Sequence, residues 1–413
     1  MNQMDAKLFS SFAERISNTA ENELTTKMMQ LSSVGVDVID LVNVPWFENG
    51  LRFDPKLVPE LYQAAATTVQ TYHPDAKGKI ELRNAIAAWY RRRGVTVLPE
   101  NIVITPGTSL AYFLLFRMFS IDQGEVMCPE PSYPLFDDIA ELSGLQVRNY
   151  PLEESSGWRI WADRINNRVT KDTRAICLVS PHNPTGAVHS EAELTELSEV
   201  CRRHQLPVIF DEVFSEFRFT EAGKVNTTPL PRPTAINSYP LSFLLNGFSK
   251  ALAMPGHKIG WVVVDGTDSA AVNKAVKALT YLTDTFLPVS EIAQSFAANV
   301  LSLRDGLTAD DTSRMIAELL AIRRSIVINE FANDPRFEFH HPAGGVYFVV
   351  ALPFGLHAED VSVGLLEEEH IFVHPGFFYN IPGEHIVFTY IMESERLRSA
   401  IKTVHRYLSN RIQ

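Results

Sequence analysis

Short apolar segments alternate with amphipathic segments over much of the chain, and this alternation constrains the fold more than any other feature of the sequence. The apolar segments have the length of β-strands, and the segments between them have helical periodicity. Strands are expected at Ile102–Ile104, Glu125–Cys128, Leu145–Tyr150, Ala175–Val179, Pro207–Phe210, Leu241–Leu245 and Gly260–Val264. The repeated strand-then-helix order predicts an α/β protein whose mostly parallel sheet is covered on both faces by helices.

The segments on either side of this alternation have a different layout. Before it, we expect helices over 20–33, Phe53–Gln70 and Ile80–Arg93 and a strand at Val38–Val42. After it, we expect a long helical region over 289–331, strands at Phe337–His340, Val346–Ala351, Ile371–Val373 and His385–Ile391, and helices over 358–369 and 394–411. This order predicts a smaller α+β domain. The expected division is a large domain over 46–295 and a small domain made of 296–413 together with the N-terminal segment 1–45.

The composition limits the classes of partner. Of the 413 residues, 46% are hydrophobic and 21% are charged, which is ordinary for a globular protein and excludes a disordered or fibrous chain. The 37 Lys and Arg against 49 Asp and Glu give a net charge of −12, which argues against nucleic acid or an anionic membrane as the main partner. No signal peptide, membrane-spanning run or metal-ligand spacing of the three cysteines is found. We therefore expect a soluble, cytoplasmic protein without a metal site.

Polar residues follow four of the expected strands. Thr105-Pro-Gly107-Thr108-Ser109 leads from a strand into a helix, where backbone N–H groups and hydroxyls can bind an anion. Asn183 lies in a loop stiffened by two prolines and a glycine, and it offers both a donor and an acceptor. Asp211 comes directly after four apolar residues, so a buried carboxylate there needs a cation or hydrogen bonds. Lys250 follows a Gly-Phe-Ser turn, and a second cation, Lys258, lies eight residues further on.

Each of these turns has an ordinary explanation when it is taken alone. Thr108 or Ser109 could cap a helix, Asp211 could do the same, Asn183 could form a plain Asn-Pro turn, and Lys250 could be a solvated loop lysine. The carboxyl ends of parallel strands meet at one edge of a sheet, however, and α/β sheets bind their ligands at that edge. The four turns together therefore predict a single site with an anion seat, a buried carboxylate, an amide and a lysine.

In combination, the motifs resemble those of the class I/II aminotransferases, the fold-type-I enzymes that use pyridoxal 5′-phosphate (PLP). The resemblance runs from about Asp37 to about Ile401. It is carried by Tyr72…Gly78…Leu82-Arg83, Pro131-Ser-Tyr133-Pro, Asn183-Pro-Thr-Gly, Asp211-Glu, Ser249-Lys250, Gly344-Gly345 and Pro375-Gly376. It implies a homodimeric enzyme with its active sites at the interface. Such an enzyme moves an amino group from an amino acid or amine to a keto or aldehyde acceptor.

The resemblance also implies roles for individual residues. Lys250 would hold PLP as a Schiff base and then move the proton between the substrate Cα and the cofactor C4′. Asp211 would pair with the protonated pyridine nitrogen, Asn183 would hydrogen-bond O3′, and Tyr133 would stack on the ring. Trp46 is a candidate for an apolar wall of the substrate pocket. The phosphate would be held by Gly107, Thr108, Ser249, Lys258 and, from the neighbouring subunit, Tyr72.

Three positions depart from the family pattern. Lys258 stands where an arginine usually grips the phosphate, and Val387 stands where an arginine usually binds the substrate α-carboxylate. The valine leaves three alternatives open. Lys77, Arg218 or backbone amides could hold the carboxylate, the substrate could be an amine without one, or the reaction could differ from standard transamination. The sequence is therefore also compatible with a PLP-dependent lyase, cyclase or decarboxylase, or with a non-catalytic PLP-binding protein.

The third departure, Phe214, generates a spectroscopic prediction. The family usually has a tyrosine here that donates a hydrogen bond to O3′, and phenylalanine cannot donate. Loss of that hydrogen bond leaves the ionised oxygen less stabilised, so the pKa of the Schiff-base nitrogen should be higher than in enzymes with the tyrosine. In a Phe214→Tyr variant, the pH titration of the visible chromophore should move to lower pH. A titration that does not move down would refute this expectation.

Overall fold

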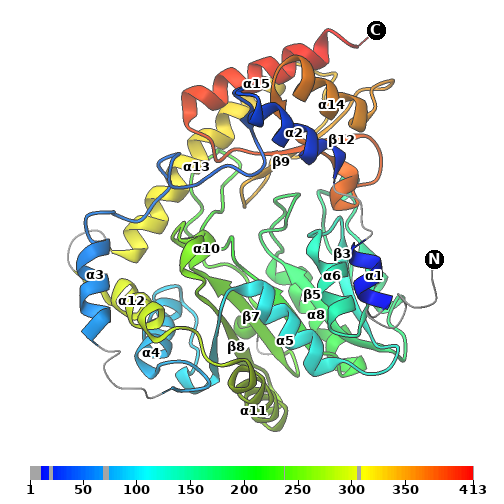
Figure 1. The fold of residues 1–413 in the computed structure, drawn as a ribbon. Coiled ribbons are helices and arrows are strands. Elements are labelled where there is room, and N and C mark those ends of the chain that lie inside the picture. Colours follow the sequence, from blue (N-terminus) through cyan, green and yellow to red (C-terminus); the bar gives the residue numbers. More distant parts are fainter. Residues whose placement is uncertain (1–10, 18–21, 68–73, 237, 305–307, 413) are drawn as a thin grey trace, which may run out of the picture.

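The computed structural model describes residues 11–17, 22–67, 74–236, 238–304 and 308–412. A large sheet with helices on both sides forms one part of the molecule, and a smaller assembly of helices and strands packs above its upper edge (Figure 1). The fold is α/β with a mostly parallel central sheet, as the strand-then-helix alternation predicts.

The central sheet has seven strands in the order β2-β8-β7-β6-β5-β3-β4. Their bounds are β2 Ile102–Thr105, β3 Glu125–Glu130, β4 Gln146–Pro151, β5 Thr173–Val179, β6 Val208–Asp211, β7 Ser242–Gly247 and β8 Gly260–Asp265. Six strands run in one direction, and β8 runs antiparallel to both of its neighbours, β2 and β7. The amino end of β8 therefore lies at the same edge of the sheet as the carboxyl ends of the other six strands.

The two faces of the sheet bury alternate residues of each strand, as the two-residue period of a strand requires. In β6, Val208 and Phe210 pack in one hydrophobic cluster and Ile209 packs in the other. The first face is covered mainly by α3 Val58–Ala66, α4 Ile80–Arg92, α8 Glu191–His204 and α12 Glu291–Ser302. The second face is covered by α5 Thr108–Phe119, α6 Leu135–Leu142 and α11 Ser269–Phe286. The short helices are α7 Ala162–Asn166, α9 Pro233–Ile236 and α10 Phe248–Ala251.

The smaller assembly combines both ends of the chain. Its helices are α2 Glu23–Ser33, α13 Ala309–Phe331, α14 Ala358–Glu368 and α15 Ser394–Ser409, and its strands are β1 Ile39–Asp40, β9 Tyr347–Ala351, β10 Ile371–Phe372, β11 His374–Pro375 and β12 His385–Thr389. β1 pairs in parallel with β10, so the N-terminal segment joins the C-terminal strands. A third hydrophobic cluster packs residues of α13, α15, β9 and β12 around Leu41, Val44 and Trp46. The remaining helix, α1 Ser11–Ser17, precedes α2.

Several expected elements differ in the structure. The helix expected over Phe53–Gln70 begins only at Val58, because Pro55 and Pro59 restrict the backbone and Pro59 fits only in a first turn. The region over 289–331 is two helices, α12 and α13, and Thr308 starts the second with a capping box to Asp311. The strand expected at Phe337–His340 makes a single bridge, from Glu338 to Ala351.

The long helix α11 was absent from the expected elements, as were the short helices α1, α7, α9 and α10. Asp268 begins α11 by accepting hydrogen bonds from the backbone N–H groups of Ala270 and Ala271. The division of the chain at residue 296 stays a prediction. In the structure, Phe296 and the rest of α12 pack on α3 and α4, whereas α13 packs on α15. No helix among the described residues is long and apolar enough to cross a membrane.

A close backbone contact fixes β8 against the turn that precedes α5. A Cβ added at Gly260 would lie 2.8 Å from the carbonyl carbon of Gly107. The Gly260→Ala variant should therefore push this turn away from β8 and lower the free energy of unfolding by about 1–3 kcal/mol. Gly256→Ala is the matched control, because a Cβ there meets nothing within 4 Å. Equal urea midpoints for the two variants would contradict this account.

Candidate active site

Asp211 places a buried carboxylate at the end of β6. Its side chain points to the same face as Ile209, toward α5, and only 7% of the residue is exposed. Tyr112 donates a hydrogen bond of 2.9 Å to Oδ2, and the backbone N–H of Val213 donates one of 2.9 Å to Oδ1. Burial raises the pKa of Asp211 to about 6, and these two hydrogen bonds oppose that rise. Each carboxylate oxygen keeps a lone pair for a further donor.

Lys250 lies in α10, immediately after the strand next to β6. Gly247 and Ser249 form the turn between β7 and the lysine, and Lys250 Nζ lies 5.5 Å from the centre of the Trp46 ring and 5.7 Å from that of Phe214. Burial among these rings lowers the pKa of Lys250, and the charge of Asp211 opposes the shift. A lowered pKa increases the fraction of neutral amine, the form that attacks a carbonyl carbon.

Asn183 follows β5 on the other side of β6. It is 7% exposed, and its side-chain oxygen has no hydrogen-bond partner among the described residues. Its side chain hydrogen-bonds Tyr347, which opposes the rise of the Tyr347 pKa that burial causes. In the same loop His182 Nδ1 lies 2.9 Å from Thr185 Oγ1, and the loop backbone packs against Gly344. The position of Asn183 is therefore fixed by the surrounding structure.

The anion seat lies at the amino end of α5. Gly107 has a φ of 95°, a left-handed conformation that favours glycine, and a Cβ there would meet nothing within 4 Å. Thr108 and Ser109 begin the helix, whose first backbone N–H groups are free to bind an anion. Lys258 lies just before β8, and the contact of Gly260 with Gly107 brings this segment to the same edge. Because β8 is antiparallel, both lysines reach the edge where the parallel strands end.

One cavity joins most of the predicted site residues. The predicted residues that line it are Lys250, Asp211, Asn183, Tyr133, Thr108 and Ser249. Gly107 precedes Thr108, and Lys258 lies exposed at the surface beyond the cavity lining. Tyr72 lies outside the described residues. The structure therefore brings together an amine, a carboxylate and an amide beside a helix amino terminus.

Two tyrosines of the cavity were missed in the sequence. Tyr112 lies four residues after Thr108 on α5, so helical spacing places both on one face, and this signal could have found it. Tyr347 comes from β9, far away in the sequence, and only the folded chain brings it beside Asn183. Trp46, which was expected to form an apolar wall, lies over the amine of Lys250.

A core residue occupies the position at which the family usually has its carboxylate-binding arginine. Val387 is fully buried in β12, where it pairs with Val349 and His374. The alternative carboxylate ligands lie elsewhere, since Lys77 Nζ donates to the Glu100 carbonyl and Arg218 lines a different pocket. Lys250 is the only cation among the described residues that line the cavity.

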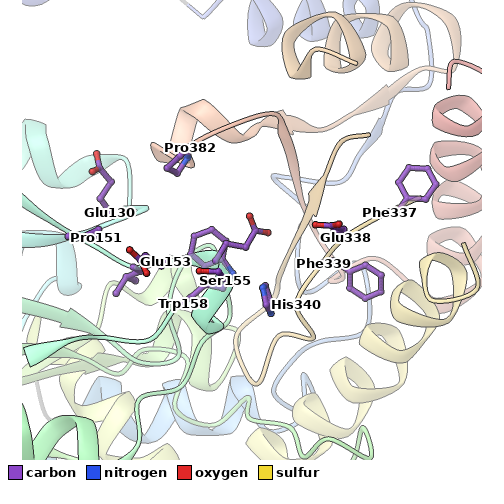
Figure 2. Close-up of a pocket in the computed structure, with 12 residues that line it drawn as sticks. Glu130, Pro151, Glu153, Ser155, Trp158, Phe337, Glu338, Phe339, His340 and Pro382 are labelled. Atoms are coloured by element: carbon purple, nitrogen blue, oxygen red, sulfur yellow. The ribbon is translucent and has the colours of Figure 1, made fainter. Parts of the chain in front are cut away.

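A larger pocket lies between the part of the molecule built on the central sheet, called here the sheet domain, and residues 337–340 and Pro382 of the smaller assembly (Figure 2). Trp158, Glu130 and Glu153 face it from the sheet domain, and Glu338 and His340 face it from the other side. Two of these carboxylates are already paired, Glu130 with Asn149 at 3.1 Å and Glu153 with Arg164. The predicted cofactor residues line the cavity at the sheet edge rather than this pocket.

The comparisons with known proteins decide the family. The model of the family "Aminotransferase class I and II" matches residues 38–404. The chain belongs to the class I and II aminotransferases. The prediction from the sequence that this chain is an aminotransferase is thereby confirmed at the level of family and enzyme class. The predicted fold-type-I architecture is confirmed as well.

Individual relatives agree with this assignment. The chain is 27% identical to a probable aspartate/prephenate aminotransferase of Aquifex aeolicus, over 93% of this chain and 94% of the relative. It is 30% identical to an arginine–pyruvate transaminase of Pseudomonas aeruginosa, over 81% of each. An Escherichia coli aminotransferase of known structure has a TM-score of 0.82 at 25% identity and covers 95% of this chain and 96% of its own.

The hydrogen bond from Tyr112 to Asp211 gives a prediction for the pH profile. Tyr112→Phe keeps the buried ring but removes a donor to the ionised carboxylate, so the pKa of Asp211 should rise. The acidic limb of the kcat/KM profile should then move to higher pH, and kcat should fall about tenfold. Tyr150→Phe is the matched control, because Tyr150 is equally buried and donates to the Cys177 carbonyl. An unmoved acidic limb in Tyr112→Phe would contradict the role of the hydrogen bond.

Proposed function

We propose that this aminotransferase uses PLP and that Lys250 binds it covalently, by condensation of the buried amine with the cofactor aldehyde. The observation that carries the proposal is one cavity that holds both the Lys250 amine, whose pKa is lowered, and the carboxylate of Asp211. The residues present fit the cofactor. The amide of Asn183 lines the same cavity as Lys250 and Asp211, and the space beside Gly107 is open. When bound, PLP supplies an electron sink that acidifies the substrate Cα–H.

Each residue of the cavity would then have a separate role in the reaction. Asp211 holds the proton on the pyridine nitrogen, and Tyr112 and the Val213 amide keep the carboxylate in place. Asn183 and Tyr133, which line the same cavity, would hold O3′ and the ring respectively. Lys250 would be the acid and base that carries a proton between the substrate Cα and C4′. Trp46 and Phe214 beside the amine exclude water from this step.

The phosphate group of PLP is assigned to the amino end of α5. The backbone N–H groups after Gly107 and the hydroxyls of Thr108 and Ser249 would bind its oxygens. Lys258 adds charge from the segment before β8, but as a point charge without the planar two-pronged geometry of an arginine. Tyr72 would reach the phosphate from the other subunit of a homodimer. We propose this dimeric state and a cytoplasmic location together with the cofactor.

The substrate is proposed to be an amino acid or an amine, with a keto or aldehyde compound as the acceptor. The relatives carry names such as arginine–pyruvate transaminase and aspartate/prephenate aminotransferase, which supports an amino acid donor. Val387 removes the arginine that would bind an α-carboxylate, which supports donors without one. In this site a carboxylate would have to rely on neutral donors such as the hydroxyl of Tyr347.

A single-turnover experiment tests the reaction. The PLP-loaded enzyme is mixed with a donor and no acceptor, first with α-amino acids and then with the matching amines that lack the carboxylate. A transaminase should leave pyridoxamine phosphate on the enzyme, because the amino group stays on the cofactor. No arginine binds the carboxylate in this site. The rate of pyridoxamine phosphate formation with an α-amino acid and the rate with its matching amine should therefore differ by less than about a hundredfold.

Other outcomes would contradict transamination. Return of the original spectrum with release of an elimination or decarboxylation product would indicate a lyase, cyclase or decarboxylase on the same fold. No spectral change with any donor, although PLP is lost in Lys250→Ala, would indicate a protein that binds the cofactor without turnover. The control for Lys250→Ala is Lys258→Ala. The control variant should still bind PLP covalently and should only bind its phosphate group more weakly.

A further inference from the structure

A second pocket, behind the Lys250 turn, is lined by five arginines. It has a volume of about 520 Å³. The arginines are Arg92, Arg93, Arg218, Arg232 and Arg314, and two carboxylates, Glu216 and Asp310, line the same pocket. We call this the arginine pocket. On a chain with a net charge of −12, such a local excess of positive charge is a feature that packing alone does not require.

Most of these arginines are already paired. Arg93 binds both oxygens of Glu216, at 2.8 and 2.6 Å, and also Asp310 at 2.8 Å. Arg232 forms an ion pair with the fully buried Glu212. The carboxylates nearest to Arg218 are thus committed to other arginines.

Arg218 is left without an ion pair among the described residues. It is only 8% exposed, and its guanidinium is fixed because Nε donates to the Ser215 carbonyl at 3.0 Å and Nη2 donates to the Thr228 carbonyl. Its Nη1 has no acceptor among the described residues, although the residue lines the pocket. Burial and the positive charge of Arg232 both lower the pKa of Arg218, to about 10, so the guanidinium stays charged at neutral pH. A buried positive charge without an ion-pair partner is unfavourable, and a bound anion would stabilise it.

We propose that the arginine pocket binds a small multivalent oxyanion, a di- or tricarboxylate or a phosphate, with Arg218 as its central ligand. A fixed guanidinium with a free N–H edge matches the oxygens of such a group. Arg314 and Arg92 lie at the more exposed rim and are each in an ion pair, with Asp311 and Asp310 respectively, so Arg218 is the pocket arginine whose charge is left for a ligand. The site is distinct from the phosphate seat at Gly107, and it does not depend on whether PLP binds there.

The pocket lies directly behind the Lys250 segment. Ser215, which lines it, accepts a hydrogen bond from Asn246 Nδ2 at 3.2 Å, and Asn246 immediately precedes the turn to Lys250. Ser313, which also lines the pocket, donates to the carbonyl of Ala251 at 2.9 Å. A bound anion would therefore contact the walls that hold α10 in place.

Calorimetric titration of the PLP-loaded enzyme tests the proposal. Loading fills the phosphate seat, so any remaining anion binding is read at other sites. Citrate and inorganic phosphate are titrated separately at constant ionic strength. We expect at least one to bind, with at least tenfold weaker affinity in Arg218→Gln. Tighter binding of citrate would assign a carboxylate ligand, and tighter binding of phosphate a phosphate ligand.

The matched control is Arg324→Gln. Arg324 is also buried, donates to a carbonyl, that of Pro342 at 2.7 Å, and lies outside the pocket lining. The affinity of the Arg324→Gln variant for the anion should stay within about twofold of that of the parent protein. If Arg218→Gln fails to fold, Thr227→Glu places a carboxylate at the exposed rim and should weaken binding tenfold. No binding to the parent at about 10 mM anion, or unchanged affinity in a folded Arg218→Gln or Thr227→Glu, would overturn the proposal.

Discussion

The burial of an amine and a carboxylate in one cavity is the constraint on which the rest of the site depends. Removing either group from water is unfavourable, and the structure offsets this with specific contacts. Tyr112 and the Val213 amide stabilise the carboxylate of Asp211, while the rings of Trp46 and Phe214 surround Lys250. Each group also shifts the other toward its charged form. The result is one cavity that holds a carboxylate and an amine whose pKa is lowered.

The reversed strand β8 explains how so many polar groups meet at one edge. In a fully parallel sheet, the segment that contains Lys258 would lie at the opposite end of the strands. Because β8 runs antiparallel to β2 and β7, its amino end lies beside Gly107 and Gly247. Gly260 packs closely against Gly107 and Gly247, and a Cβ at Gly260 or Gly247 would push these segments apart.

The sequence predicted the sheet and most of the cavity because both follow from local patterns. Apolar runs marked the strands, and the polar residue after each strand marked the edge, as with Asp211 and Asn183. The sequence did not predict α11, whose beginning at Asp268 is a local cap, or the division of 289–331 into two helices. Tyr347 could not be predicted, because its place beside Asn183 depends on how the C-terminal strands pack on the large sheet. Val387 was recognised only as a departure, and the structure adds that it is part of a closed core.

The account as a whole depends on a covalent bond between the amine of residue 250 and an aldehyde cofactor. The most direct measurement is borohydride reduction of the purified protein mixed with PLP, followed by peptide mass spectrometry. The account predicts a visible chromophore before reduction and one cofactor adduct, on the peptide that contains Lys250, which is absent in Lys250→Ala. A protein without a chromophore, or with its adduct on another lysine such as Lys258, would contradict it.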